Sequence, residues 1–380
     1  YGIRLKKFAL LSVSDKTNIV PFAQELISSD YNILATGNTA KLLKQSGIDC
    51  IGISSLTGFP EIFSGRVKTL HPVVFGGILL RRDNELDLKE ALSNNINPID
   101  IVCVNLYPFI KVTQNPDVTL EDTIENIDIG GPSLIRAAAK NYKFVAVLTD
   151  PEQYEPFLTE FRNGGITEET RKRLAVDAFS HTSHYDTYIS NHLEQKFEFS
   201  PSHIRIHLPK EKILRYGENP HQYAAIFGNF SDYFEVLHGK EISYNNILDI
   251  IAAVELVEDL EPNSCSIIKH NNPCGAASAE NTLEAYKKAL FCDPTSAFGG
   301  IVAFNEIVDK LTAEKLNEIF LEVVVAPGFT EDALTVLTKK KDRRLVKTLK
   351  SASAGGMQLK SIPGGFLAQE SDSILLNKES

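Results

Sequence analysis

The feature that most constrains the fold is an alternation of short apolar runs with helical segments in the first half of the chain. A helix is expected over residues 19–26, a charged helix over 83–93, and mostly helical structure over 151–193. Helices that alternate with buried strands predict an α/β fold with a parallel sheet. The four runs with the length and composition of buried strands are residues 8–13, 31–35, 99–104 and 144–148.

Length and composition narrow the class of protein. The 380 residues exceed what one hydrophobic core usually serves, so two domains are expected. The formal net charge of -10 argues against nucleic-acid or membrane-surface binding. Five scattered cysteines without a CxxC pair indicate neither a disulfide framework nor a zinc site. Since the sequence shows neither a membrane-length apolar run nor a signal-peptide region, we expect a cytoplasmic protein with reduced thiols.

Two successive predicted strands end in hydroxyl-rich turns. The first runs into Ser14, Asp15, Lys16 and a helix, where Ser14 or Asp15 is expected to cap the helix. The second runs into residues 36–40, which again open a helix. A helix N-terminus with nearby hydroxyls and a lysine suits an oxyanion. Two such turns in neighbouring βα units predict one anion pocket.

Residues 65–77 place Arg66 and Lys68 between glycines and a proline. If the segment is extended, both cations point to the same side, because side chains alternate along a strand. Two converging cations beside a glycine-rich turn suit a phosphate or another oxyanion. The alternative is the entry to a strand with exposed basic residues.

Polar residues also follow the third predicted strand and precede a later helix. Asn105 and Tyr107 fall at the carboxyl edge of the predicted sheet, where open α/β sheets bind ligands, although a buried core tyrosine is an alternative. Asp128 stands beside two glycines, just before a helix expected to begin near Pro132. On that helix Arg136 and Lys140 are four residues apart and share a face.

The second half contains a separate set of polar turns. Residues 194–212 lose apolar periodicity, which predicts domains of residues 1–199 and 200–380. A later strand delivers Lys269 and His270 into a turn marked by proline and glycine. A histidine suits proton transfer and an adjacent lysine stabilises negative charge. A metal site with Cys274 is the rival reading, but no second ligand stands at metal spacing.

These motifs resemble a known family. In order and approximate spacing, the first half is similar to the IMP cyclohydrolase domain of the bifunctional AICAR transformylase/IMP cyclohydrolase family of purine biosynthesis. That domain has a methylglyoxal-synthase-like fold whose parallel sheet holds a nucleotide monophosphate. The matching stretches are Ser12-Val13-Ser14-Asp15-Lys16, Thr36-Gly37-Asn38-Thr39, Gly58-Phe59-Pro60-Glu61, Gly65-Arg66-Val67-Lys68-Thr69-Leu70-His71-Pro72, Asn105-Leu106-Tyr107-Pro108-Phe109 and Ile127-Asp128-Ile129-Gly130-Gly131.

The resemblance implies that the first domain closes formyl-AICAR to IMP with loss of water. Lys68 and Tyr107 would polarise the formyl oxygen, Asp128 would handle the amide protons, and Lys140 would be an orienting charge. No metal or redox cofactor is expected. The residues implied to hold the phosphate, the ribose and the rest of the substrate are Ser12, Ser14, Lys16, Thr36, Gly37, Thr39, Arg66, Thr69, Asn105, Gly130 and Gly131.

The second half is similar to the transformylase domain of the same family, a cytidine-deaminase-like α/β domain that uses no zinc. Arg215 and Tyr216 would bind the AICAR phosphate, Asn246 would contact the substrate, and Lys269 and His270 would be catalytic. The co-substrate would be formyl-tetrahydrofolate. The family also implies a homodimer whose transformylase site forms between the subunits. A helix over residues 250–257 is expected with Ser243 or Asn245 as its cap.

Two departures from the family pattern qualify these expectations. The family's chains continue beyond Ser380, so the transformylase domain is expected to be incomplete, through fragmentation or loss of that activity, and its activity absent or impaired. The family commonly has a histidine where this chain has Phe75, which we expect to pack beneath the loop, while His71 is expected to be structural. The rival functions are a methylglyoxal-synthase-like lyase acting on a triose phosphate and a non-enzymatic nucleotide-sensing module.

Overall fold

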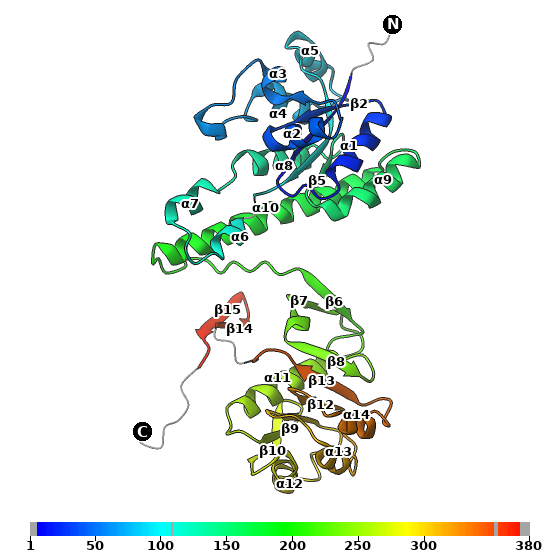
Figure 1. Cartoon of the computed structure of the whole chain (residues 1–380), viewed down its shortest axis with the longest axis vertical. Coiled ribbons are helices and arrows are strands. Elements are labelled where there is room, and N and C mark those ends of the chain that lie inside the picture. The colour runs from blue at the N-terminus through cyan, green and yellow to red at the C-terminus, as the bar shows by residue number, and fades with distance from the viewer. Residues whose placement is uncertain (1–5, 108, 353–355, 373–380) are drawn as a thin grey trace. The chain divides into compact units, whose positions relative to one another are not determined.

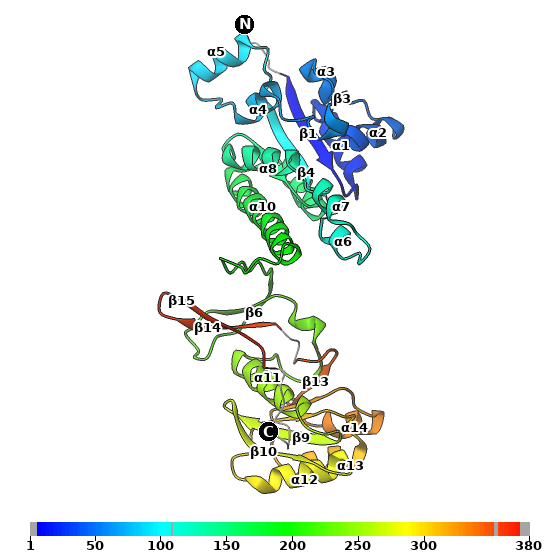
Figure 2. The same cartoon turned by 90° about the vertical axis from the view of Figure 1, so that its left-hand side faces the viewer.

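A computed structural model describes residues 6–107, 109–352 and 356–372. The chain forms two compact units, residues 1–207 and 208–380, which are described separately (Figures 1 and 2). No helix of the described part is both long and apolar enough to cross a membrane. Pro108, from one of the motifs above, and the last residues of the tail lie outside the described residues.

The first unit is built on a five-stranded parallel sheet with the strand order β3-β2-β1-β4-β5. The chain winds from β1 outward to β3, then returns to the other side of β1 to add β4 and β5. Because parallel crossovers are right-handed, this reversal places helices on both faces of the sheet. The strands are β1 (Lys7–Val13), β2 (Tyr31–Ala35), β3 (Ile51–Gly52), β4 (Ile99–Asn105) and β5 (Ala146–Leu148).

Helices flank this sheet and bury its apolar strands. The 29-residue helix α10 packs against α8 and β5 (Figure 1). The helical elements are α1 (Ile19–Ser28), α2 (Gly37–Gln45), α3 (Ile53–Thr57), the 3-10 turn η1 (Phe63–Gly65), α4 (Pro72–Leu79), α5 (Glu85–Ser93), α6 (Phe109–Thr113), α7 (Leu120–Glu125), α8 (Gly130–Lys140), η2 (Pro151–Gln153), α9 (Tyr154–Arg162) and α10 (Glu168–Lys196). The predicted α/β class and parallel sheet are confirmed.

Two local expectations for this unit were wrong, and a third was met. Neither Ser14 nor Asp15 caps α1, whose N-cap is Asn18 with a left-handed φ of 56°. The cation stretch is not extended, since Arg66 has the helical angles φ -61° and ψ -29° at the end of η1. The helix expected near Pro132 begins at Gly130, in agreement with the prediction, and the Asp128 carboxylate accepts the backbone N–H of Gly131 in its first turn.

The second unit has a six-stranded mixed sheet with the order β10-β9-β11-β12-β13-β8. Strands β11, β12 and β13 are parallel, whereas β9 pairs antiparallel with both of its neighbours, as does β8 with β13. The strands are β8 (Phe234–His238), β9 (Ser264–Lys269), β10 (Asn272–Ser278), β11 (Ile301–Phe304), β12 (Val323–Ala326) and β13 (Arg344–Thr348). Two separate hairpins pair β6 (Lys210–Leu214) with β7 (Ala224–Phe227) and β14 (Met357–Ile362) with β15 (Gly365–Glu370).

The two faces of the mixed sheet bury different helices. Ile268 packs on one face with α11 (Tyr244–Glu258), while its neighbour Ile267 packs on the opposite face with the other long helices. Ser243 caps α11 through a capping box with Asn246, so Ser243 is the cap and Asn245 is not. The remaining helical elements are η3 (Phe230–Asp232), α12 (Thr282–Cys292), α13 (Lys310–Leu316) and α14 (Glu331–Leu337).

Candidate active site

The site begins where β1 and β4 end side by side, at the point where the strand order reverses. Asn105, the last residue of β4, is buried and its side chain reaches the turn after β1. Its Oδ1 accepts the backbone N–H groups of Ser14 at 2.6 Å and Asp15 at 2.9 Å, and its Nδ2 donates to the Asp15 carbonyl at 3.0 Å. Asn105 therefore positions the turn, and both ends of its amide are already bonded within the protein.

The hydroxyls of the first two turns meet as expected. Ser12 Oγ and Thr36 Oγ1 lie 2.6 Å apart, which joins the ends of β1 and β2. Thr39 Oγ1 accepts the Val13 N–H and donates to the Val13 carbonyl, each at 3.1 Å. Thr36 is the N-cap of α2 but makes no side-chain capping bond, so its hydroxyl stays with Ser12 at the edge of the sheet.

Lys16 closes the turn after β1 through its ammonium group. Its Nζ donates to the carbonyls of Val13 at 2.5 Å and Ser14 at 3.3 Å. Burial lowers the pKa of Lys16, and the nearby Asp15 opposes that effect. A cation at the carboxyl end of β1 is suitable for binding an anion at this edge.

A second cluster forms at the N-terminus of α8. A Cβ added to Gly130 would lie 2.9 Å from Thr69 Oγ1, and one added to Gly131 would lie 2.5 Å from Asp128 Oδ2 and 2.7 Å from Leu106 Cδ2. A side chain at either position would force these neighbouring side chains to move, because three segments of chain converge there. Asp128 Oδ1 accepts the Gly131 N–H at 2.9 Å. The structure thus brings Thr69, Asp128 and both glycines to the residue that follows β4.

Tyr185 on α10 supports this cluster, and the sequence analysis missed it. Its hydroxyl accepts the backbone N–H of Asp128 at 2.8 Å and donates to the Asn126 carbonyl at 3.4 Å. The side chain is buried, and burial raises the pKa of Tyr185. Tyr185 and Asp128 are 57 residues apart in the chain. The only local sequence signal for their contact is a tyrosine within a helix that otherwise supports the sheet.

Three further predicted residues lie at the surface. Arg66 forms an ion pair with Glu125 of α7, with 2.7 Å between Nη2 and Oε1. Lys68 is exposed and directly precedes the buried Thr69. Tyr107 is 52% exposed, two residues beyond Asn105. Lys68 and Tyr107 are therefore accessible to a ligand held at the sheet edge.

Lys140 is not brought to Asp128. It ends α8, ten residues after Gly130, and a helix rises about 1.5 Å per residue, so about 15 Å separates the two backbone positions. Lys140 instead borders a surface pocket with Tyr142, Lys172 and Phe179. The spacing that put Arg136 and Lys140 on one helix face does not put Lys140 at the site.

His71 and Phe75 have the structural roles expected of them. His71 is the N-cap of α4, and its Nδ1 accepts the Val73 N–H at 3.2 Å. Phe75 is partly buried within α4 and packs against the core of the first unit. These contacts agree with a structural role for both residues, and α4 rather than a strand follows the cation stretch.

In the second unit, Lys269 and His270 stand at the tip of the β9–β10 hairpin. His270 and Asn271 have φ values of 52° and 59°, the left-handed pair that a tight two-residue hairpin turn requires. The Asp249 carboxylate accepts the backbone N–H groups of His270 at 3.2 Å and Asn271 at 2.7 Å. Lys269 Nζ donates to the Phe298 carbonyl at 2.8 Å. Asp249, which the sequence analysis did not select, thus holds the turn that carries the histidine.

Of the remaining residues predicted for the transformylase site, Arg215 and Tyr216 are accessible to a ligand, whereas the side-chain amide of Asn246 is not. The Arg215 guanidinium lies over the Tyr216 ring, 5.1 Å from its centroid, and Arg215 is exposed. Asn246 is buried, completes the capping box with Ser243, and donates to Glu322 Oε2 at 3.0 Å. Its amide is therefore already bonded within the protein. Across the described residues, no group of three or more His, Cys, Asp or Glu side chains could hold a metal ion.

Comparison with known proteins agrees with this architecture. Residues 18–133 match the MGS-like domain family, so the first unit contains an MGS-like domain. Residues 138–380 match the family described as the AICARFT/IMPCHase bienzyme. A solved structure described as "Crystal structure of ForH" has 38% sequence identity and a TM-score of 0.45, and its match covers 48% of this chain and 95% of that one.

Curated relatives extend the match to nearly the whole chain. The bifunctional purine biosynthesis protein PurH of Bacillus mycoides (strain KBAB4) is 49% identical over 385 residues, which cover 99% of this chain and 75% of the relative. PurH of Bacillus anthracis matches with the same identity and the same coverage. The chain therefore belongs to the AICARFT/IMPCHase family of bifunctional purine-biosynthesis enzymes, which confirms the resemblance carried by the motifs.

Proposed function

We propose that the first domain, residues 1–199, catalyses the dehydrative closure of formyl-AICAR to IMP. The observation that supports this most is the convergence of Thr69, Asp128, Gly130 and Gly131 at the residue after β4, at the same sheet edge as the Lys16 turn. One end of this edge offers hydroxyls and a cation for a phosphate. The other offers a carboxylate for proton transfer.

The chemistry requires the carboxamide nitrogen to attack the formyl carbon and to lose one proton. The bond between that carbon and the former formyl oxygen then breaks, the formamide nitrogen loses its proton as the new C=N bond forms, and the oxygen leaves as water. Asp128 takes a proton from the attacking nitrogen, while Lys68 and Tyr107 donate to the formyl oxygen as it gains charge. The phosphate and ribose are held by Ser12, Thr36, Lys16 and neighbouring backbone N–H groups. Arg66 and Ser14 complete the anion site, and Gly37 lets the chain approach the ligand. In this mechanism Asn105 and Thr39 position the turns, and Lys140 has no assigned step.

For the second domain, residues 200–380, we propose the framework of AICAR formyl transfer from formyl-tetrahydrofolate. His270 would move the proton, Lys269 would stabilise the oxyanion, and Arg215 with Tyr216 would bind the AICAR phosphate. We expect transformylase activity of this chain to be absent or impaired. Formyl-tetrahydrofolate turnover by the purified 380-residue chain at a rate comparable to cyclisation would contradict that expectation. A homodimer and a cytoplasmic location also remain predictions.

The cyclisation test follows the ultraviolet absorbance of formyl-AICAR as IMP forms. We expect turnover by the intact chain and a loss of about 10²- to 10⁴-fold in kcat for Asp128→Asn, the range typical of a removed general acid or base. We also expect Lys68→Met to lower kcat, because it removes a donor to the formyl oxygen. Lys89→Met on α5 is its matched surface control, since Lys89 is exposed and lies on an element outside the site. The proposal fails if folded wild-type protein forms no IMP, or if Asp128→Asn retains full activity.

The two rival functions account for less of the chain. A methylglyoxal-synthase-like lyase does not explain why residues 138–380 match the bienzyme family. A nucleotide sensor needs no carboxylate positioned as Asp128 is, between a glycine pair and a tyrosine hydroxyl. Methylglyoxal release from a triose phosphate, or IMP binding without turnover, would favour the respective rival.

A further inference from the structure

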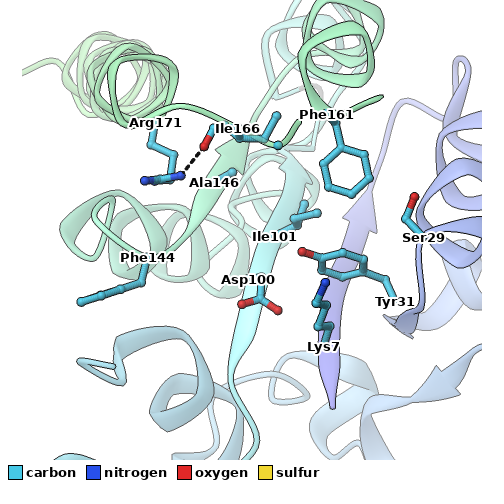
Figure 3. Close-up of a pocket in the computed structure, with 11 residues that line it drawn as sticks. Lys7, Ser29, Tyr31, Asp100, Ile101, Phe144, Ala146, Phe161, Ile166 and Arg171 are labelled. Carbon is cyan, nitrogen blue, oxygen red and sulfur yellow. Dashed lines mark hydrogen bonds between the residues drawn. The ribbon is translucent and has the colours of Figure 1, made fainter. Parts of the chain in front are cut away.

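The first sheet carries a second pocket at its amino edge, opposite the candidate active site. This pocket has a volume of about 380 Å³ and is lined by residues from the beginnings of β1, β2, β4 and β5 together with α9 and α10 (Figure 3). The volume lies within the range of small-molecule sites. The side chains that matter for its chemistry are Lys7, Tyr31, Asp100, Phe144, Phe161 and Arg171.

Two buried polar atoms of this pocket have no hydrogen-bond partner in the described part of the chain. Asp100 Oδ1 pairs with Arg82 Nη1 at 2.8 Å, whereas Asp100 Oδ2 is buried and unpaired. Arg171 Nη1 donates to the Ile166 carbonyl at 2.6 Å, whereas its Nε is buried and unpaired. Buried polar groups in proteins are nearly always hydrogen-bonded, so this wall of the sheet holds more unpaired polar atoms than a simple apolar surface would.

The walls of the pocket are aromatic and its open charges are positive. The Tyr31 and Phe161 ring centroids are 5.8 Å apart with the rings tilted by 59°, so the two rings form one aromatic wall. Lys7 Nζ lies 5.4 Å from the Tyr31 ring centroid. Lys7 and Arg171 are the two cations of the lining, and its one carboxylate, Asp100, is already paired with Arg82. The pocket therefore favours an anion.

We propose that this pocket binds a planar aromatic anion. The ring packs against Tyr31 and Phe161 and the anionic group lies at Lys7, while Arg171 adds positive charge to the opposite wall of the pocket. Burial raises the pKa of Asp100, and this effect is opposed by Arg82, by a backbone hydrogen bond from Phe8 and by Lys7.

This pocket and the candidate active site lie at opposite ends of the same strands. Strand β1 begins at Lys7 and ends at Val13, and at about 3.3 Å per residue its ends are about 20 Å apart. A ligand at the amino edge therefore touches none of the residues assigned to cyclisation. The two proposals can be tested separately, because variants of one site leave the side chains of the other unchanged.

The probe for the test is orotate, a pyrimidine carboxylate with ring N–H groups and no phosphate. Calorimetric titration of the full chain should show orotate binding that weakens at least tenfold in Lys7→Met and in Arg171→Met. The matched controls are Lys6→Met and Lys172→Met, which remove the same charge from the adjacent positions outside this pocket. Uracil, which lacks the carboxylate, should bind at least tenfold more weakly than orotate.

Several results would overturn the proposal. They are no orotate binding at millimolar concentration, equal binding by uracil, and equal loss in the adjacent controls. Because Lys7 is exposed, Lys7→Met should fold normally even if Arg171→Met does not, and unchanged binding in Lys7→Met also overturns the proposal. Loss of binding in Lys68→Met would place the probe at the carboxyl edge instead, whereas cyclisation activity is unaffected by any of these binding outcomes.

Discussion

Asn105 offers the sharpest test of how the candidate active site is assembled. Its amide holds the turn after β1 by two accepted bonds, from Ser14 and Asp15, and one donated bond, to Asp15. Asn105→Ala removes all of them and leaves two backbone N–H groups without their acceptor. Since the ligand-binding hydroxyl and lysine of the turn depend on that backbone, the same change should lower cyclisation activity.

The expected cost follows from these bonds. Each contributes a net of about 1 kcal/mol, and stranding partly buried donors adds to the cost, so we expect a loss of about 2–4 kcal/mol. At about 1.4 kcal/mol per tenfold change in an equilibrium constant, local opening of the turn should become on the order of 10²-fold more frequent. The loss should be local, because α1 and β4 keep their core contacts.

Hydrogen exchange measured by mass spectrometry on peptides that cover residues 11–18 reports this opening directly. Asn32→Ala is the matched surface control, because Asn32 makes one exposed bond to the Lys7 carbonyl at 3.2 Å, and its removal should cost less than about 0.5 kcal/mol. Asn105→Asp keeps an acceptor for both N–H groups but sets a carboxylate against the Asp15 carbonyl. Asn105→Asp should therefore raise exchange over residues 11–18 by less than Asn105→Ala does.

The assembly described above would be refuted if Asn105→Ala exchanged at the wild-type rate over residues 11–18. An equal effect of Asn32→Ala would also refute it, since the amide network would then be no stronger than one exposed bond. Loss of activity with unchanged exchange would mean that Asn105 contacts the substrate itself, as the motif resemblance implied.

Three further predictions address other parts of the chain. Tyr185→Phe removes the acceptor of the Asp128 N–H, so kcat for cyclisation should fall about tenfold with KM little changed; a change in KM alone would argue against a positioning role. Asp249→Asn replaces a charged acceptor of two backbone N–H groups, and exchange at the 270–271 turn should rise while the first unit is unaffected; unchanged exchange there would show that the carboxylate is dispensable. Hydrogen bonds from two threonines hold the pKa of Glu160 below its ordinary value of 4.5, so this carboxylate stabilises the fold above pH 4.5 and loses that effect as pH falls through its lowered pKa. The difference in denaturant midpoint between wild type and Glu160→Gln should therefore shrink on acidification, and a difference that grows would contradict the assignment.

Much of the fold was predictable from the sequence because its signals are local. The apolar run of residues 99–104 needs only its own composition to be recognised as a buried strand, and β4 spans Ile99–Asn105. Ser243 was a plausible cap because capping depends on residues three apart. Local signals alone also made the expectation for the cation stretch wrong. Its glycines and Pro72 are visible in the sequence, but whether they belong to a strand or to the start of α4 depends on packing against residues elsewhere in the chain.

The site was only partly predictable because its contacts are long-range. Motif membership placed Asp128 and Thr69 in one pocket, and the structure brings them together at Gly130 and Gly131. The sequence analysis also placed Lys140 in this pocket. Helical periodicity reports which face of a helix a residue occupies, but not how far along the helix axis it lies. Tyr185 was missed because no local pattern indicates which backbone N–H a helix hydroxyl will reach.

The strand order explains why these residues form one site at all. Asn105 and Ser14 are 91 residues apart, and they touch only because β4 returns to pair with β1 rather than continuing beyond β3. At that reversal the chains leaving β1 and β4 depart toward opposite faces, which leaves a crevice at the carboxyl ends. A sheet with sequential strand order would place β2 and β3 between them and separate Asn105 from the turn it holds. The order of the strands, which no single motif encodes, therefore decides that the Lys16 turn and the Asp128 cluster act on one substrate.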